Sequence, residues 1–186
     1  MCMLTISVGA KMNRLKQGKP QHTESRMTAA KTPLAARTRL DGLPGHYTRR
    51  LNQIAVALFF QETEQWGITP VQYAAMQTVF HSPGLDQRKL ARAIGFDAST
   101  ITGVIDRLEA RGLVSRTPSA QDRRVRLLDL TDDGKSLLEK VIPAMLRSQE
   151  RLLAPLSKND RAEFMRIIQK LVIANNEMSR APSNGN

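Results

Sequence analysis

The sequence predicts a mainly helical protein that carries a small two-stranded β-ribbon. Apolar residues recur at helical spacing through most of the chain after Leu43, and cap residues and glycine or proline breaks divide this pattern into separate helices. Two short strands are predicted between Leu113 and Leu130, around a polar loop that is rich in arginine. The ribbon therefore lies within the helical series, with helices before and after it.

Length and composition allow one folded domain with tails. The chain has 186 residues, of which 41% are hydrophobic, so it can build one core. Its 28 Lys and Arg against 17 Asp and Glu give a formal net charge of +11, which favours nucleic acid as the partner. No apolar run approaches the ~20 residues of a membrane span, and the start does not resemble a secretion signal. We therefore expect a cytoplasmic protein with no membrane partner.

A disordered basic leader is predicted over 1–42, and a disordered tail over 179–186. The leader sustains no apolar period, and Glu24 is the only acidic residue among its first 40. The basic residues in the same stretch are Lys11, Arg14, Lys16, Lys19, Arg26, Lys31, Arg37 and Arg39. Three interpretations stay open: an arm that adds nonspecific phosphate affinity, a segment without a role that translation from Met12 or Met27 would omit, and an organellar transit peptide.

Two helices are expected at the start of the folded part. The first covers 44–66, in about five turns, with apolar residues at Tyr47, Leu51, Ile54, Leu58 and Phe59. Thr69 and Pro70 supply the cap and first residue of the second helix, which Ser82-Pro83-Gly84 stops.

A pair of short helices follows. Asp86 is a suitable N-cap for a helix over Gln87 to Ile94, which Gly95 ends, and Asp97 caps a further helix that Gly112 closes. Two short helices joined by a tight glycine turn form a helix-turn-helix. The second helix buries one stripe of Ile101, Val104, Ile105 and Leu108 and leaves a surface of Ser99, Thr100, Thr102, Gly103, Asp106 and Arg107. Such a face can enter the DNA major groove; a solvated helix with ordinary caps is the alternative.

The two strands enclose a basic loop from Thr117 to Arg124. A ribbon with an arginine-rich tip is a wing, which can lie along a duplex and insert a cation into the minor groove. We predict that Asp122 pairs with the guanidinium of Arg124 and holds it in place; a soluble loop without a role is the alternative. The DNA-contact candidates on both elements are Gln87, Arg88, Ser99, Thr100, Thr102, Gly103, Arg107, Asp122, Arg123, Arg124 and Arg126.

Three motifs in this region resemble a known family. They are Asp97-x-Ser99-Thr100, Asp106-Arg107-Leu108-Glu109-x-Arg111-Gly112-Leu113-Val114, and Asp122-x-Arg124 followed after five residues by Leu130-Thr131. The pattern is similar to that of MarR-type transcriptional regulators and runs from about Leu43 to Leu171. The resemblance implies that the helix after Asp97 reads the major groove, that Arg124 enters the minor groove, and that the terminal helices form an obligate dimer. Gly103 departs from the pattern, because relatives often carry a larger polar side chain there.

The C-terminal third predicts a homodimer independently of the family resemblance. Thr131 caps a long helix, which Pro155 ends, and Pro143 inside this helix should bend it. Ser157-x-x-Asp160 resembles a capping box that opens a last helix. The apolar residues of the two helices are Leu137, Leu138, Val141, Ile142, Met145, Leu146, Phe164, Ile167, Ile168, Leu171 and Val172. Together they exceed the apolar patch that a soluble monomer tolerates.

The predicted domain is therefore a winged helix-turn-helix flanked by N- and C-terminal dimerisation helices. It covers 43–178, with the winged helix-turn-helix at about 70–131 and the dimerisation helices at about 44–66 and 132–178. Nothing in the sequence favours an enzyme or a cofactor. His22, His46 and His81 lack ligand-like spacing, and the single cysteine, Cys2, excludes a cysteine-based metal cage.

We interpret the chain as a homodimeric repressor that binds a palindromic operator on double-stranded DNA. A sequence-neutral architectural DNA-binding protein is the alternative, because high charge alone would suffice for it. The segment from Gly45 to Phe60 resembles regulators of aromatic and nitrogen-heterocyclic acid breakdown, so a small aromatic or pyridine carboxylate is the expected effector. The candidate ligand residues are His46, Arg49, Arg50, Gln53, Tyr73 and Gln77; for each, a surface charge or a satisfied core polar group is the alternative.

Overall fold

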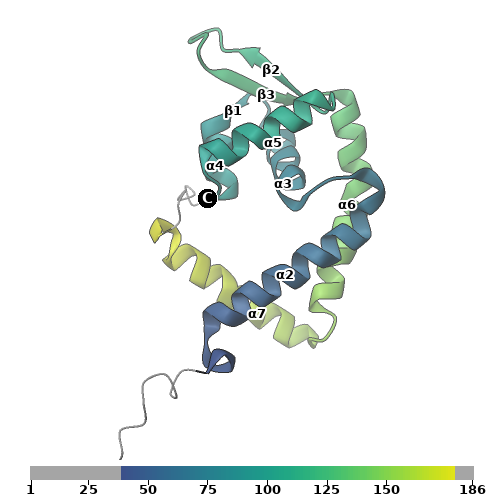
Figure 1. The fold of residues 1–186 in the computed structure, drawn as a ribbon, viewed down its shortest axis with the longest axis vertical. Coiled ribbons are helices and arrows are strands. Elements are labelled where there is room, and N and C mark those ends of the chain that lie inside the picture. Colours follow the sequence, from purple (N-terminus) through teal and green to yellow (C-terminus); the bar gives the residue numbers. More distant parts are fainter. Residues whose placement is uncertain (1–38, 179–186) are drawn as a thin grey trace, which may run out of the picture. The chain divides into compact units, whose positions relative to one another are not determined.

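The six predicted α-helices and the two predicted strands appear in order in the computed structural model, which describes residues 39–178 (Figure 1). The helices are α2 (Pro44–Thr63), α3 (Pro70–His81), α4 (Gln87–Ile94), α5 (Ala98–Ala110), α6 (Asp132–Leu153) and α7 (Lys158–Ala174). The strands are β1 (Leu85–Asp86), β2 (Val114–Pro118) and β3 (Arg126–Leu130), and short 3₁₀ turns are η1 (Leu40–Gly42), η2 (Glu64–Trp66) and η3 (Asn176–Met178). Residues from Leu40 onward belong to one compact unit, and the predicted leader up to residue 38 and the predicted tail lie outside the described residues.

Side-chain caps begin the helices where the sequence places them. The Thr69 hydroxyl accepts a hydrogen bond from the Gln72 amide, and the Gln72 side chain accepts one from the Thr69 amide, so α3 opens with a full capping box. Ser157 caps α7, but the Asp160 carboxylate accepts from the Ser157 hydroxyl at 2.7 Å. The predicted box is therefore only half formed, because aspartate is one methylene shorter than the usual glutamate.

A third strand corrects the predicted two-stranded ribbon. The sheet is antiparallel with the order β1-β3-β2, and Leu85 of β1 lies opposite Leu128 of β3. A strand of two residues is too short to show an alternating pattern. It matters for the site because it joins the start of α4 to the wing strand β3 through backbone hydrogen bonds.

The main core lies where α3, α4 and α5 pack against the sheet and the start of α6. All four apolar residues of the predicted stripe on α5 are buried, at 1% exposure or less: Ile101, Val104, Ile105 and Leu108. Full burial of each such side chain contributes ~1.5–3 kcal/mol. This face fixes α5 on the domain, and Ser99 and Thr100 on its other side are exposed.

Much of the predicted apolar face of α6 is covered within the same chain, although Leu146 is 52% exposed. α6 packs along α2, Val141 is buried, and Ile142 and Met145 pack against the core. Glu62 of α2 joins the two helices, because its carboxylate accepts from Arg151 at 2.8 Å and from Arg147 at 2.9 Å. The hydrogen bond from Arg151 has the largest effect and that from Arg147 the next largest, and together they hold the pKa of the Glu62 carboxyl below its ordinary value.

More of the unburied apolar surface lies on α7. No residue of α7 is buried, and Leu171, Val172 and Ile173 are 58%, 62% and 76% exposed. Pro143 lies inside α6 as the sequence indicates, and its bending of the helix stays a prediction.

Candidate nucleic-acid interface

Hydroxyl side chains at the start of α5 are organised by the Asp97 carboxylate. It accepts hydrogen bonds from the Thr100 amide at 2.8 Å, from the Thr100 hydroxyl at 2.7 Å and from the Ser99 hydroxyl at 2.5 Å. Together these bonds hold the pKa of the Asp97 carboxyl well below its usual range, and the bond from the Ser99 hydroxyl has the largest effect. Asp97 is therefore a carboxylate at neutral pH, and it fixes the first turn of α5.

This network changes what the face can offer to a base. Thr102 also donates inward, from its hydroxyl to the Ala98 carbonyl at 2.9 Å. The protons of these three hydroxyls are therefore used within α5 and its cap. Oxygen lone pairs and the threonine methyl groups remain available, and these can meet adenine or cytosine amino groups and the thymine methyl.

Asp122 shapes the wing in a different way from the predicted ion pair. Its carboxylate accepts from the backbone amide of Arg124 at 2.9 Å, while the guanidinium has no ion pair with any residue of 39–178. An aspartate that bonds the amide two residues on forms an Asx-turn. Asp122 therefore sets the loop conformation and leaves the Arg124 guanidinium unpaired.

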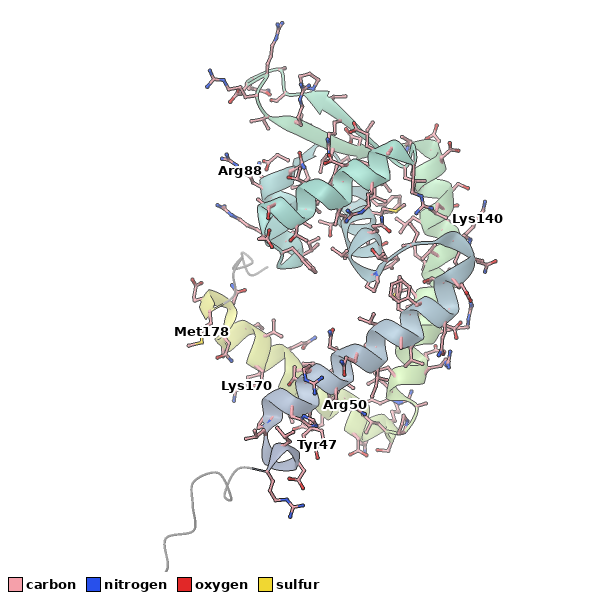
Figure 2. All side chains as sticks on the ribbon, viewed as in Figure 1. Tyr47, Arg50, Arg88, Lys140, Lys170 and Met178 are labelled. Atoms are coloured by element: carbon pink, nitrogen blue, oxygen red, sulfur yellow. The ribbon has the colours of Figure 1, made fainter. Side chains whose placement is uncertain are left out.

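The start of α4 and the wing share one hollow of about 420 Å³. Five of the predicted DNA-contact residues line it: Gln87, Arg88, Asp122, Arg124 and Arg126. Figure 2 shows the Arg88 side chain pointing outward from the start of α4. The fold thus brings cations from α4 and from the wing together beside α5, although they are far apart in the sequence.

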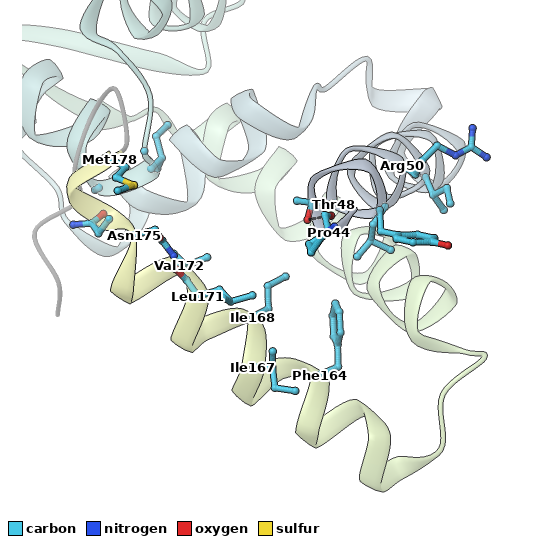
Figure 3. Close-up of a pocket in the computed structure, with 17 residues that line it drawn as sticks. Pro44, Thr48, Arg50, Phe164, Ile167, Ile168, Leu171, Val172, Asn175 and Met178 are labelled. Atoms are coloured by element: carbon cyan, nitrogen blue, oxygen red, sulfur yellow. Dashed lines mark hydrogen bonds between the residues drawn. The ribbon is translucent and has the colours of Figure 1, made fainter. Parts of the chain in front are cut away.

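A second, larger hollow of about 1150 Å³ lies between the start of α2, the end of α4 and α7. Phe164 and Ile168 of α7 point toward α2, as Figure 3 shows, and Tyr47, Leu51 and Ile54 line the α2 side. Tyr47 is 56% exposed and Ile54 47%. A large exposed apolar surface of this kind is typical of a site where another molecule binds.

Comparison with known proteins decides the family. The sequence model of the MarR family matches residues 68–125. A putative transcriptional regulatory protein for the hcr operon of Thauera aromatica is 34% identical over 129 residues, which cover 68% of this chain and 77% of that relative. This chain belongs to the MarR family. Its named relatives are transcriptional regulators.

Solved structures of MarR-type regulators share the fold. The PcaV regulator of Streptomyces coelicolor in complex with its natural ligand is 35% identical, with a TM-score of 0.69 over 74% of this chain and 96% of PcaV. The repressor CouR bound to a 23-mer DNA duplex is 27% identical, with a TM-score of 0.68 over 72% of this chain and 94% of CouR. Bordetella bronchiseptica BpsR, whose DNA binding is regulated by 6-hydroxynicotinic acid, is 27% identical, with a TM-score of 0.69 over 72% and 96%.

The six candidate ligand residues of this MarR-family chain do not meet in one hollow. Arg50 alone lines the larger hollow, and its guanidinium points away from the α7 side chains (Figure 3). The other contacts are Arg49 to Gln53 at 3.3 Å and Gln77 to His81 at 3.0 Å.

Tyr73 is half-buried, and its ring lies 6.0 Å from that of Phe59. Burial raises the pKa of the Tyr73 hydroxyl. Arg49, Arg50 and Gln53 lie exposed at the start of α2, and His46 is partly buried there. Tyr73 instead lies beside Phe59, in the last two turns of α2.

Sequence reasoning missed two arginines that position the interface. Arg116 of β2 forms ion pairs with Asp106 and Glu109 of α5, which fix the wing on that helix. Arg111 follows α5 and donates to the carbonyls of Trp66 and Gly67, both at 2.9 Å. The signal for the Arg116 ion pairs was the pair of acidic residues three positions apart on α5, followed by an arginine in the next strand. The Arg111 hydrogen bonds gave no signal, because their acceptors are backbone carbonyls, which every residue carries.

None of the helices within 39–178 is long and apolar enough to cross a membrane. Among the same residues, no group of three or more His, Cys, Asp or Glu is arranged to hold a metal ion.

Proposed function

We propose that this protein is a sequence-specific transcriptional repressor that binds double-stranded DNA as a homodimer. The observation that carries the proposal is the hollow that Arg88 of α4 lines together with Arg124 and Arg126 of the wing. Both α4 and the wing strand β2 contact α5. In this arrangement α5 enters the major groove through its first turns, and Arg124 of the wing reaches the minor groove. CouR, a repressor with the same fold, is bound to a DNA duplex in its structure.

Selection from a pool of random duplexes tests the proposal and separates it from an architectural role. We expect the protein to enrich one near-palindromic sequence, here called the selected operator. Its affinity for this duplex should exceed that for a scrambled duplex by about a thousand-fold or more at fixed salt concentration. A protein that enriches no sequence, or binds both duplexes with similar affinity, is the architectural DNA-binding protein of the alternative interpretation.

The proposed dimer rests on α7 and the start of α2. Leu171 and Val172 are exposed beside the apolar hollow that Tyr47 and Ile54 also line, and a symmetric second copy would cover both surfaces. Two recognition helices on one face of a duplex then need half-sites about one helical turn apart, ~34–36 Å.

Sedimentation tests the dimer. We expect a dimer at micromolar concentration for the wild type, and Leu171→Asp should weaken it at least ten-fold because a charge enters the apolar surface. Gln169→Asp adds the same charge on an exposed polar position of α7 and should leave the dimer intact. A folded wild-type monomer of 20.8 kDa would refute this assembly.

We further propose that a small aromatic or pyridine carboxylate releases the protein from its operator. His46, Arg49 and Arg50 give the start of α2 a cluster of groups that can pair with a carboxylate, and BpsR is regulated by a compound of this class. A ligand shifts the spacing of the recognition helices only by its difference in affinity for the two spacings. A 100-fold difference corresponds to roughly 2.7 kcal/mol of coupling per site.

A panel of benzoates and hydroxynicotinates, added to the preformed operator complex, tests the effector. We expect at least one compound to release the wild type, and Arg50→Ala to bind the operator normally but to lose the release. Lys140→Ala removes an exposed cation on α6 and should keep both properties. If no compound releases the wild type, the carboxylate proposal is withdrawn while the repressor proposal stands.

A further inference from the structure

We infer that Arg107 recognises a guanine in each half-site, because its guanidinium occupies the space that Gly103 leaves open on α5. The inference rests on the proposed sequence-specific DNA binding and names the base that one residue selects. It concerns the position at which the sequence departs from its family.

The geometry on α5 brings the two residues together. Gly103 and Arg107 are four positions apart on one helix, so they lie on the same face, and helical side chains lean toward the N-terminus. A Cβ added at Gly103 would lie 3.6 Å from Nη1 of Arg107, and apart from its chain neighbours and the helix backbone no other atom of the described residues lies within 4 Å. The guanidinium therefore lies over residue 103, one turn closer to the end of α5 that approaches the bases.

Within the described part of the chain, the Arg107 guanidinium forms no ion pair with an acidic side chain. Asp106 and Glu109, its acidic neighbours on α5, both pair with Arg116. Within 39–178, Arg107 forms no ion pair, and its side chain is exposed. A guanidinium in this position can meet a base edge without first breaking an ion pair.

The chemistry of the remaining face then assigns the base. Guanine presents two acceptors, O6 and N7, in the major groove, and an arginine binds both with two parallel N–H groups. The hydroxyl protons of Ser99, Thr100 and Thr102 are used inside α5. Arg107 is therefore the residue of this face that supplies a pair of donors, while the hydroxyl oxygens and methyl groups suit the other bases.

Selection from random duplexes with four variants tests the inference. Arg107→Ala and Arg107→Lys should each lose the preference for one guanine per half-site by about ten-fold, because neither retains the paired donors. Gly103→Leu should lose the same preference, since its side chain takes the space of the guanidinium. Gly103→Ala should keep it, because a Cβ at 3.6 Å is an ordinary contact. The other positions of the selected operator should stay unchanged in all four variants.

Matched controls separate base recognition from other effects. Lys140→Ala removes an exposed cation on α6 and should keep the guanine preference, and the thermal midpoint of Gly103→Leu should not fall below that of the wild type. The inference is overturned if Arg107→Ala weakens binding to all sequences equally, which is the behaviour of a phosphate contact, or if it keeps the guanine. A wild type that enriches no sequence at all overturns the proposed function instead.

Discussion

Arg124→Ala is expected to lower affinity for the selected operator at least ten-fold while leaving a folded dimer. The Arg124 guanidinium has no ion pair within 39–178, and Asp122 fixes the backbone that carries it. A cation held in this way can enter a narrow minor groove, where the negative potential is enhanced. Its loss removes a charge-assisted contact without disturbing a contact of the folded chain.

Titration of the variant against operator and scrambled duplexes measures the effect. Arg123→Ala is the matched control, because Arg123 is the exposed arginine beside it in the same loop. We expect Arg123→Ala to weaken binding to both duplexes by a similar, smaller factor, as a phosphate contact would. Unchanged operator affinity of Arg124→Ala would remove the assignment of the wing to the minor groove.

Gly134→Ala should destabilise the protein by about 1–3 kcal/mol, the usual cost of excess volume in a packed interior. Gly134 lies in the first turn of α6, and a Cβ there would overlap the Leu113 carbonyl. That oxygen cannot move freely, because it accepts a hydrogen bond from the Thr131 amide at 3.2 Å. The glycine therefore permits α6 to start against the base of the wing.

Urea unfolding at one protein concentration measures this loss, since the stability of a dimer depends on concentration. Gly103→Ala is the control within the same chain. Its Cβ has ordinary space, so the substitution should be neutral or stabilising by up to ~1 kcal/mol, the usual helix preference for alanine. Equal unfolding midpoints for Gly134→Ala and the wild type would contradict the close approach.

Local signals predicted the helices well, because each helix start is decided within a few residues. Thr69 with Gln72 begins α3, and Asp86 and Asp97 begin α4 and α5, as the sequence indicates. The MarR motifs also located the face of α5 and the wing loop. These features depend on contacts between residues three or four apart, which a single sequence displays.

The features that sequence reasoning missed depend on residues far apart in the chain. β1 exists because two residues pair with β3, and α6 packs along α2, which is far from it in the sequence. Gly134 looks like any glycine in a first helical turn until Leu113 is placed beside it. The predicted pair of Asp122 with the Arg124 guanidinium was wrong, because an aspartate can accept from a nearby backbone N–H as readily as from a side chain, and here it accepts from the Arg124 amide.

The tether of Arg111 to the carbonyls of Trp66 and Gly67 makes α5 a lever with one fixed end. The helix has 13 residues and is therefore ~20 Å long. A tilt of roughly 10° about the tethered end displaces its Asp97 end by ~3 Å, which is as long as a hydrogen bond. A rotation small enough to leave the tether intact is thus large enough to separate the first turn of α5 from a base edge.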